Sequence, residues 1–564
     1  MAMINSQFLR TLNVVLILIS LTSAVSAQPP AERVESKLGM VVCVSPPAAE
    51  VGAAILRNGG NAVDAAVAVG FTMAVTWPEA GNIGGGGFMM VSVPGLEPTC
   101  IDYREMAPAA AKVDLFADGK VTGLDHKAAG VPGTVRGLAL AHERFGKLSW
   151  KEVVMPAVQL AEDGFTVNAV LASGLNRVLG DPKTTNAEFK RVYGKTDGSK
   201  WQAGDKLVLK ELGRTLRSIA EKGADAFYTG ESAELLDKEM KAEGGLISKS
   251  DLAAYKAIER KPISTTYRGY SVFGPPPPSS GGICLAEMLN ILENYDLKKF
   301  GRWHAETSHL MIEVMKRGYA DRARYLGDPN FVKIPDYLTT KEYARKLTAN
   351  IDPVKATPSE QVAPEIVLDK EGDSTTHFSI VDKDRLAVSN TYTLENAYGN
   401  RVVVRGAGYI LNNEMTDFNR KPGITTRSGL IGTKPNQIAP GKRMLSSMTP
   451  TIVQKDGKTV LVTGSPGGRT IINTVLCIVV NVVDFEMPVN EAVSAPRFHH
   501  QWFPDVAKFE GVKQYPAVVE NLKMMGHKVN EFQEGDAHSI WIDPKSGLRV
   551  GAADKRRDGK AIGE

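Results

Sequence analysis

The sequence DSTTH at residues 373–377 places two threonines at the start of an expected strand. A threonine hydroxyl is a weak nucleophile unless a base lies beside it, and the nearest candidate base is the threonine's own α-amine. The unperturbed pKa of an α-amine is about 7.7 to 8.0, so part of it is neutral at physiological pH. Thr375 has such an amine only if the chain is cut after Ser374. Paired threonines are also ordinary strand residues, so this pattern alone leaves both interpretations open.

Other common catalytic patterns are missing from the sequence. The chain has no G-x-S-x-G elbow, no S-x-x-K and no H-E-x-x-H motif, which argues against elbow-type serine hydrolases, penicillin-binding folds and zincins. The glycine-rich run 81–87 leaves a helix and enters a strand, the reverse of a phosphate-binding loop. Neighbouring His499 and His500 point in different directions, and no carboxylates are spaced to join them, so we expect a structural role for both. We predict neither a metal nor a cofactor.

The elements expected around the threonine pair change character along the chain. Residues 47–57 and 62–75 have helical periodicity, and helical stretches alternate with polar loops from about 135 to 350, the longest loop being 181–205. Residues 351–374 contain three prolines and many charges, which indicates an exposed, mobile linker. Strands dominate thereafter, with a turn at Asp456-Gly457, and SPGGR at 465–469 leads into a helix. We therefore expect sheets between helical layers.

Composition and charge favour a globular protein with small-molecule substrates. The 564 residues are 43% hydrophobic and 23% charged, with a net charge of +4. No basic run indicates binding to nucleic acid or to a membrane surface. Residues 1–27 combine Arg10, the apolar run 12–21 and small residues before Gln28, which indicates a secretory signal peptide, with an uncleaved anchor as the alternative. We expect an exported protein, periplasmic or secreted, with no membrane contact after signal cleavage.

Export permits disulfide bonds, but the four cysteines show no C-x-x-C spacing, which excludes a zinc ribbon. They are Cys43, Cys100, Cys284 and Cys477. We expect four buried thiols, and the sequence leaves open a single bridge such as Cys43 to Cys100.

Seven motifs along the chain resemble those of the bacterial γ-glutamyltranspeptidases, which are N-terminal nucleophile hydrolases. They are DYREMAP (102–108), ADRARYLGDP (320–329), DSTTHFSIVDKD (373–384), LNNEMTDF (411–418), LSSMTPTIV (445–453), TGSPGGRTII (463–472) and APRFHHQW (495–502). The resemblance extends from about residue 37 to 555. It implies an α+β fold, a four-layer αββα sandwich of the N-terminal nucleophile hydrolase type, autocleaved into two subunits that form one fold.

The resemblance further implies a proenzyme that cuts itself before Thr375. Residues 28–374 would form the large subunit and residues 375–564 the small catalytic subunit, which stay together as partners. Thr375 would attack glutathione or a related γ-glutamyl compound, and the acyl-enzyme would pass the γ-glutamyl group to water or to an amino acid or dipeptide. Two alternatives stay open: a related β-lactam side-chain (glutaryl) acylase, and an uncleaved periplasmic γ-glutamyl-binding protein without turnover.

The resemblance also implies roles for site residues. A γ-glutamyl group carries an α-carboxylate and an α-ammonium, so its pocket needs a cation or hydroxyls for one and acids for the other. Thr393 matches a threonine that hydrogen-bonds the nucleophile, and Gly467 and Gly468 match the donors to the oxyanion. The residues matched to the substrate carboxylate are Arg104, Ser446 and Ser447, and those matched to the ammonium are Glu414 and Asp417.

Two positions depart from the family pattern. Glu395 stands where many relatives have asparagine, although other bacterial relatives have glutamate, so we expect γ-glutamyl recognition with altered contacts to the ammonium. Residues 419–440 keep the length of a pocket-covering lid, but Ser428 lies near the position where some relatives have tyrosine. How tightly this lid holds the substrate, and the balance between transfer and hydrolysis, stay open. The presence of Asp417 argues against the acylase alternative.

Overall fold

The computed structural model describes residues 31–182, 186–366, 369–370, 376–533 and 535–564. The predicted signal peptide at 1–27, and the predicted nucleophile and cut at Ser374 and Thr375, lie outside these residues. Within the described ranges, no helix combines the length and apolar character that crossing a membrane requires.

Two seven-stranded sheets lie at the centre of the molecule, and neighbouring strands in both are antiparallel. Sheet I has the order β1 (Glu32–Ser36), β20 (Arg549–Ala553), β19 (His538–Ile542), β15 (Lys458–Thr463), β14 (Thr451–Lys455), β9 (Tyr270–Gly274), β8 (Ile263–Tyr267). Sheet II has the order β21 (Lys560–Gly563), β2 (Met40–Cys43), β11 (Thr376–Val381), β12 (Ala387–Thr393), β3 (Gly86–Ser92), β4 (Thr99–Asp102), β7 (Ile258–Arg260). Both sheets combine strands from before and after the predicted cut.

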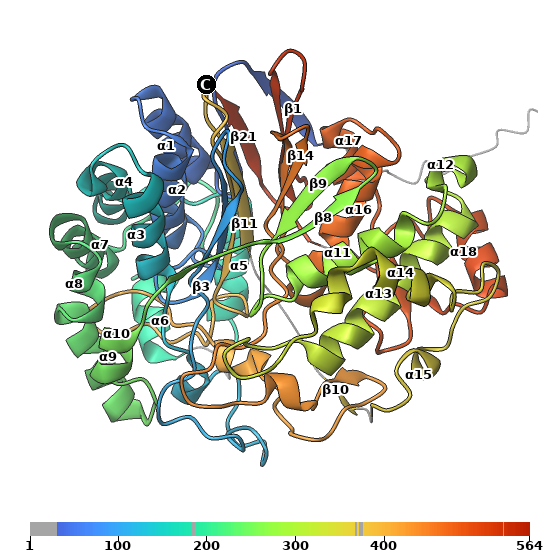
Figure 1. Cartoon of the computed structure of the whole chain (residues 1–564). Coiled ribbons are helices and arrows are strands. Elements are labelled where there is room, and N and C mark those ends of the chain that lie inside the picture. The colour runs from blue at the N-terminus through green and yellow to red at the C-terminus, as the bar shows by residue number, and fades with distance from the viewer. Residues whose placement is uncertain (1–30, 183–185, 367–368, 371–375, 534) are drawn as a thin grey trace, which may run out of the picture.

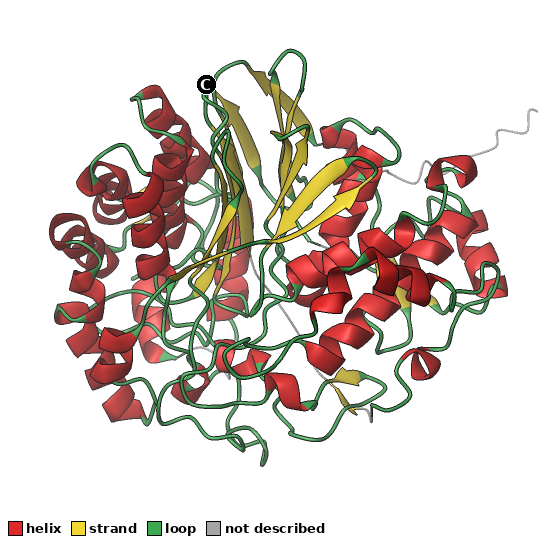
Figure 2. Cartoon of the chain, in the orientation of Figure 1, coloured by secondary structure: helices red, strands yellow, loops and turns green. Residues whose placement is uncertain are grey.

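A helical layer covers the outer face of each sheet (Figures 1 and 2). Sheet II is covered by α1 (Pro46–Arg57), α2 (Ala62–Thr76) and α3 (Thr134–Phe145), with α4 (Trp150–Asp163) and α7 (Lys210–Lys222) packed outside them. Sheet I is covered by α11 (Gly281–Leu292) and α16 (Ile471–Val483), with α13 (Ala305–Tyr325), α14 (Lys341–Thr348) and α18 (Pro516–Met524) beside them. The predicted four-layer αββα sandwich is therefore confirmed in its layers.

Shorter elements connect these layers. The helices are α5 (Ala169–Leu179), α6 (Ala187–Tyr193), α8 (Asp225–Tyr228), α9 (Glu231–Glu243), α10 (Lys249–Ala254), α12 (Leu297–Phe300), α15 (Ser359–Val362) and α17 (Val489–Ser494). The small sheets pair β5 (Phe165–Thr166) with β6 (Lys206–Leu207), β10 (Asp369–Lys370) with β13 (Gly429–Leu430), and β16 (Phe498–His499) with β17 (Ala507–Phe509) and β18 (Val529–Glu531).

Apolar burial on both sides of each sheet explains the layer order. The space between the sheets is filled by side chains from both, including Met40 and Val42 from sheet II and Val462 and Ile540 from sheet I. All residues of α2 are buried, as its Ala- and Val-rich sequence predicts, because the helix lies between sheet II and the helices outside it. Burial of apolar surface contributes about 25 cal/mol per Å², which makes these interfaces the main source of stability.

Two predicted loops contain packed structure. The predicted exposed, mobile linker 351–374 is right in part: most of its described residues are exposed, but Ser359 and Ala363 are buried and the short helix α15 forms there. Ser359 donates hydrogen bonds from its N–H and its hydroxyl to Asp505. In the predicted long loop 181–205, helix α6 forms and buries Phe189 and Tyr193. Isolated apolar residues that pack on distant elements produce no periodicity, so the sequence pattern missed both.

All four cysteines are buried free thiols, which confirms the expectation of four thiols. Cys43 lies on β2 and Cys100 on β4, and three strands of sheet II separate them. Because strands lie about 4.8 Å apart and a disulfide needs Cα atoms within about 7 Å, the alternative bridge is wrong. Burial raises the pKa of Cys43 to about 12, so this thiol stays protonated.

Candidate active site

All predicted site residues that the structure describes, except Gly467, line one pocket. Its unfilled volume is about 690 Å³, part of it open to solvent. The predicted residues on its wall are Arg104, Thr393, Glu395, Glu414, Asp417, Ser446, Ser447 and Gly468. They come from segments up to 364 residues apart in sequence, so the fold assembles a set that the resemblance named only from separate motifs.

One side of the pocket lies at the end of β12, where Thr393 is on the wall, beside the start of β11. Strand β11 starts at Thr376, one residue after the predicted nucleophile, and Thr376 pairs with Tyr392, the neighbour of Thr393. Thr393 is buried, and its hydroxyl accepts a hydrogen bond from the Glu395 N–H at 2.8 Å. The Asn82 side chain donates to the Thr393 carbonyl at 2.9 Å. These bonds fix Thr393 at the pocket wall.

The predicted oxyanion glycines form a turn between β15 and α16. Gly467 has φ +130° and Gly468 has φ +55°, both in the region that favours glycine. A Cβ on Gly467 would lie 2.4 Å from the Thr470 hydroxyl, so a larger residue there is strained and crowded. Backbone N–H groups at the start of a helix favour negative charge. The turn therefore offers donors of the kind that an oxyanion needs.

Arg104 lies at the centre of a buried ionic cluster just beyond β4. Its Nη1 lies 2.6 Å from Glu414 and 3.3 Å from Glu105, and its Nη2 pairs with Asp417. Glu414 and Asp417 lie on one turn of 3-10 helix, η3 (Glu414–Asp417), which brings both carboxylates to the guanidinium. Burial disfavours the Arg104 charge, but the surrounding acids outweigh burial and raise the pKa of the guanidinium. The cation and the acids predicted for the two substrate charges are thus adjacent and paired.

The serine pair is held by the proline-rich turn before α11. The Ser446 N–H donates to the Pro278 carbonyl at 2.8 Å, and the Ser280 hydroxyl donates to the Ser446 carbonyl at 2.6 Å. The Ser447 hydroxyl accepts from Arg322 Nη2 at 3.0 Å. Because arginine can only donate, this bond leaves the Ser447 hydrogen available for an acceptor in the pocket.

Glu395 has an unusual backbone at the pocket wall. It has φ +73°, a left-handed conformation that costs a residue other than glycine about 1 to 3 kcal/mol. The side-chain amide of Asn413 donates to its carboxylate. This bond holds the acidic side chain of a strained residue beside Thr393, and the expected role of Glu395 in substrate contacts stays a prediction.

The lid segment, residues 419–440, contributes to the pocket wall as expected. Its wall residues are Asn419, Arg420, Leu430, Ile431 and Asn436. Ser428 is not among the wall residues, and its hydroxyl lies 3.3 Å from the Thr426 hydroxyl. Strand β13 of this segment pairs with β10, in which Asp369 lies opposite Leu430.

Sequence reasoning missed two arginines of the pocket. Arg322 is buried on α13 and also donates to the Ser280 hydroxyl at 2.9 Å, and Arg469 follows Gly468 directly. The signals were present, because Arg322 lies in ADRARYLGDP and Arg469 in SPGGR. Nothing in their spacing indicated that α13 and the glycine turn face the same pocket.

A pH effect is expected from Glu105, the neighbour of Arg104. Burial raises the pKa of Glu105 to about 7, although Arg104 acts in the opposite direction. Above pH 7 the ionised Glu105 adds negative charge beside Arg104, which would weaken the binding of a substrate carboxylate to Arg104. We expect the KM for a γ-glutamyl donor to rise between pH 6.5 and 8.5, and to rise less in Glu105→Gln. Steady-state kinetics across this range measure both profiles, and identical profiles would contradict a role for Glu105.

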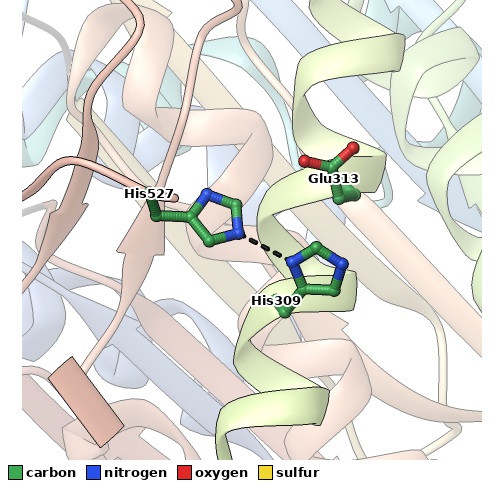
Figure 3. Close-up of side chains that lie close together, drawn as sticks. All are labelled: His309, Glu313 and His527. Atoms are coloured by element: carbon green, nitrogen blue, oxygen red, sulfur yellow. Dashed lines mark hydrogen bonds between the residues drawn. The ribbon is translucent and has the colours of Figure 1, made fainter. Parts of the chain in front are cut away.

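A second polar cluster lies outside the pocket (Figure 3). His309 and Glu313 from α13 and His527, just after α18, bring one possible ligand atom each within 4.8 Å of one another. His309 Nε2 bonds the Asp352 carbonyl at 2.7 Å, and its Nδ1 lies 2.7 Å from His527 Nε2. Glu313 pairs with Lys316 and Arg317 and accepts from the Thr357 N–H. The ligand atoms of the three side chains are therefore already hydrogen-bonded or ion-paired. The bonds to Asp352 and Thr357 hold the segment 352–357 against α13.

The predicted structural role of His499 and His500 agrees with their contacts. Both are buried, and His499 bonds Asn473 and Gln501, whereas His500 bonds Asp505. Burial lowers the pKa of His499 to about 3, so this ring stays neutral.

Comparisons with known proteins show the family of the chain. Residues 48–564 match the family described as gamma-glutamyltranspeptidase. The glutathione hydrolase proenzyme of Escherichia coli strain K12 is 47% identical over 575 residues, which cover 98% of each chain. The acylase ACY 1 proenzyme of Pseudomonas sp. strain SE83 is 35% identical over 543 residues, which cover 93% of each chain. The solved cephalosporin acylase of Bacillus halodurans has a TM-score of 0.84 at 27% identity, over 95% of this chain and 97% of that one. The chain therefore belongs to the gamma-glutamyltranspeptidase family.

Proposed function

We propose that this chain is a γ-glutamyltransferase and glutathione hydrolase. The observation that carries the proposal is the pairing of Arg104 with Glu414 and Asp417 inside a pocket that also contains Ser447 and Gly468. A buried cation next to two acids complements the adjacent carboxylate and ammonium of a γ-glutamyl group. The 47% identity to a glutathione hydrolase proenzyme supports the same substrate class.

The reaction begins once the chain is cut before Thr375. The free α-amine of Thr375 takes the proton of its own hydroxyl, and the oxygen attacks the γ-carbonyl carbon of the donor. Backbone N–H groups of Gly467 and Gly468 stabilise the oxyanion, a contribution of about 10² to 10³ in rate for one donor. The C–N bond then breaks, and the leaving amine takes the proton held by the α-amine. Water or an amine acceptor attacks the ester and releases Thr375.

Substrate charges are divided between the two sides of the ionic cluster. The α-carboxylate would bind Arg104 together with the hydroxyls of Ser446 and Ser447. The α-ammonium would replace Arg104 as the partner of Glu414 and Asp417, and Glu395 would add a further acceptor. Thr393 would orient the hydroxyl of Thr375.

Maturation and localisation form part of the same proposal. After removal of residues 1–27, self-cleavage before Thr375 would give subunits 28–374 and 375–564. The mature protein would be exported, periplasmic or secreted, with no membrane contact. The word proenzyme in the E. coli relative's name supports the processing step.

A matched pair of donors tests the substrate assignment. γ-Glutamyl-p-nitroanilide and N-glutaryl-p-nitroanilide differ only in the α-ammonium. With the glutaryl compound, Glu414 and Asp417 would lose their cationic partner, so we expect kcat/KM to be lower by about 10 to 100-fold. The release of p-nitroaniline measures kcat/KM for both compounds. Preference for the glutaryl compound would favour the acylase, and binding of the glutamyl compound without release would favour the binding protein.

A further inference from the structure

The pocket contains positive charge that its own acids do not neutralise. Arg104 contacts three acids, whereas neither Arg322 nor Arg469 forms an ion pair with any described acidic residue. Burial lowers the pKa of Arg322, and the nearby Arg469 lowers it further. Two guanidinium groups on one wall, without a matched carboxylate, favour an anionic ligand group.

A second substrate carboxylate is the natural counterpart of this charge. The γ-glutamyl α-carboxylate is already accounted for by Arg104 and the serine pair. Glutathione has another carboxylate at its C-terminus, in the part that leaves, and amino acid and dipeptide acceptors carry one in the corresponding part. This second carboxylate therefore needs a cation on the side of the scissile bond away from the glutamyl group.

Arg469 lies beside the glycine turn on the pocket wall. It directly follows Gly468, whose N–H is assigned to the oxyanion of the scissile carbonyl, and its side chain lines the pocket. Arg469 Nη1 donates to the Gly429 carbonyl of the lid segment at 2.8 Å, which restrains the guanidinium while its other N–H groups face elsewhere. Two residues of a leaving dipeptide span at most about 7 Å, a distance comparable with the reach of an arginine side chain.

Arg322 lies close enough to Arg469 for the two charges to interact, although it also bonds the Ser447 hydroxyl on the glutamyl side. Its Nε and Nη2 are used by the Ser280 and Ser447 hydroxyls, so its guanidinium is fixed in the wall. The residue is buried, and its charge is therefore weakly screened by solvent. It raises the positive potential of the wall on which Arg469 lies.

We propose that Arg469 is the carboxylate-binding residue of the leaving-group and acceptor subsite, with Arg322 reinforcing its potential. The proposal rests on the proposed function and adds a specificity for partners with a free C-terminal carboxylate. No bond is made or broken at Arg469, so it affects binding and positioning of the leaving amine or the acceptor.

The first test uses the unaltered mature protein and needs no variant. Three donors share the γ-glutamyl group: glutathione, its glycine ethyl ester and γ-glutamyl-p-nitroanilide, of which only glutathione carries the second carboxylate. We expect kcat/KM for glutathione to exceed that for the ester by about tenfold at low salt, in line with one charge-assisted hydrogen bond. The difference should shrink at high salt, because the site is partly open to solvent. Equal values for acid and ester would overturn the proposal.

The second test compares variants by the ratio of kcat/KM for glutathione to that for the ester. Arg469→Gln should lower this ratio about tenfold, Arg469→Lys should restore most of it, and Arg144→Gln, which removes a surface arginine paired with Glu259, should not change it. A ratio that Arg469→Gln leaves at the original value would overturn the proposal, even if both rates fall. If the unaltered protein turns over none of the three donors, the proposed function itself fails. That result differs from a loss of the preference for glutathione over its ester.

Discussion

Thr375→Ala is expected to give a single uncut chain without turnover of any γ-glutamyl donor. The variant lacks the hydroxyl that attacks the substrate, and it lacks the oxygen that would attack the bond after Ser374. The unaltered protein should show two fragments, one of 190 residues beginning at Thr375. Denaturing electrophoresis and N-terminal sequencing measure both, and two fragments from Thr375→Ala would contradict the assignment.

Two further substitutions separate a chemical role from a structural one. Thr375→Ser keeps a hydroxyl and should still be cut, with lower activity. Thr376→Val removes the neighbouring hydroxyl at almost constant volume and should leave the cut and the turnover intact, because Thr376 is an ordinary buried residue of β11. If Thr376→Val is not cut while Thr375→Ala is cut, the nucleophile is Thr376 and not Thr375.

Arg104→Ala is expected to lose both stability and activity. The sequence alone suggests a defect in substrate binding, but the structure adds a folding defect, because the guanidinium is the cationic partner of Glu414, Glu105 and Asp417 in a largely buried cluster. Breaking a buried ion pair by removing one partner costs about 3 to 5 kcal/mol. Thermal unfolding should show a clear fall in Tm, and an unchanged Tm would contradict the description of the cluster.

Arg104→Lys isolates the binding contribution. Lysine keeps the charge among the three acids but cannot offer the two-pronged contact of a guanidinium, so the chain should fold and the donor KM should rise by about 10 to 100-fold. Arg549→Lys is the matched control, since Arg549 is also buried and bonds backbone carbonyls outside the pocket. Its KM should stay unchanged. A KM in Arg104→Lys equal to that of the control would remove Arg104 from the site.

Elements with strong local signals were predicted well from the sequence. The helices expected at 47–57 and 62–75 correspond to α1 and α2, and the second begins with the reciprocal hydrogen bonds of Asn61 and Asp64. The turn expected at Asp456-Gly457 joins β14 to β15 with positive φ at both residues. Local chemistry determines these features, so a short window of sequence contains the information.

The structure brings most of the predicted site residues to one pocket, but their contacts could not be predicted from the sequence. The resemblance named Arg104, Glu414 and Asp417 separately, and only the fold shows that they form one paired cluster. Arg322 and Arg469 were missed because their role depends on the approach of α13 to the glycine turn, a contact between segments 147 residues apart. The packed residues of 351–366 were missed for the same reason. Contacts that distant segments make leave no local pattern.

If the chain is cut as proposed, the shared sheets determine the order of folding and cleavage. With the cut before Thr375, strands β11 and β12 of one piece lie between β2 and β3 of the other, so neither piece can complete sheet II alone. Under the proposed cut, folding would come first and scission second. The mature molecule would then be two chains whose reassembly from the unfolded state depends on their concentration. Its lifetime after export would then be governed by the rate at which it unfolds, and not by a reversible equilibrium between the folded and unfolded states.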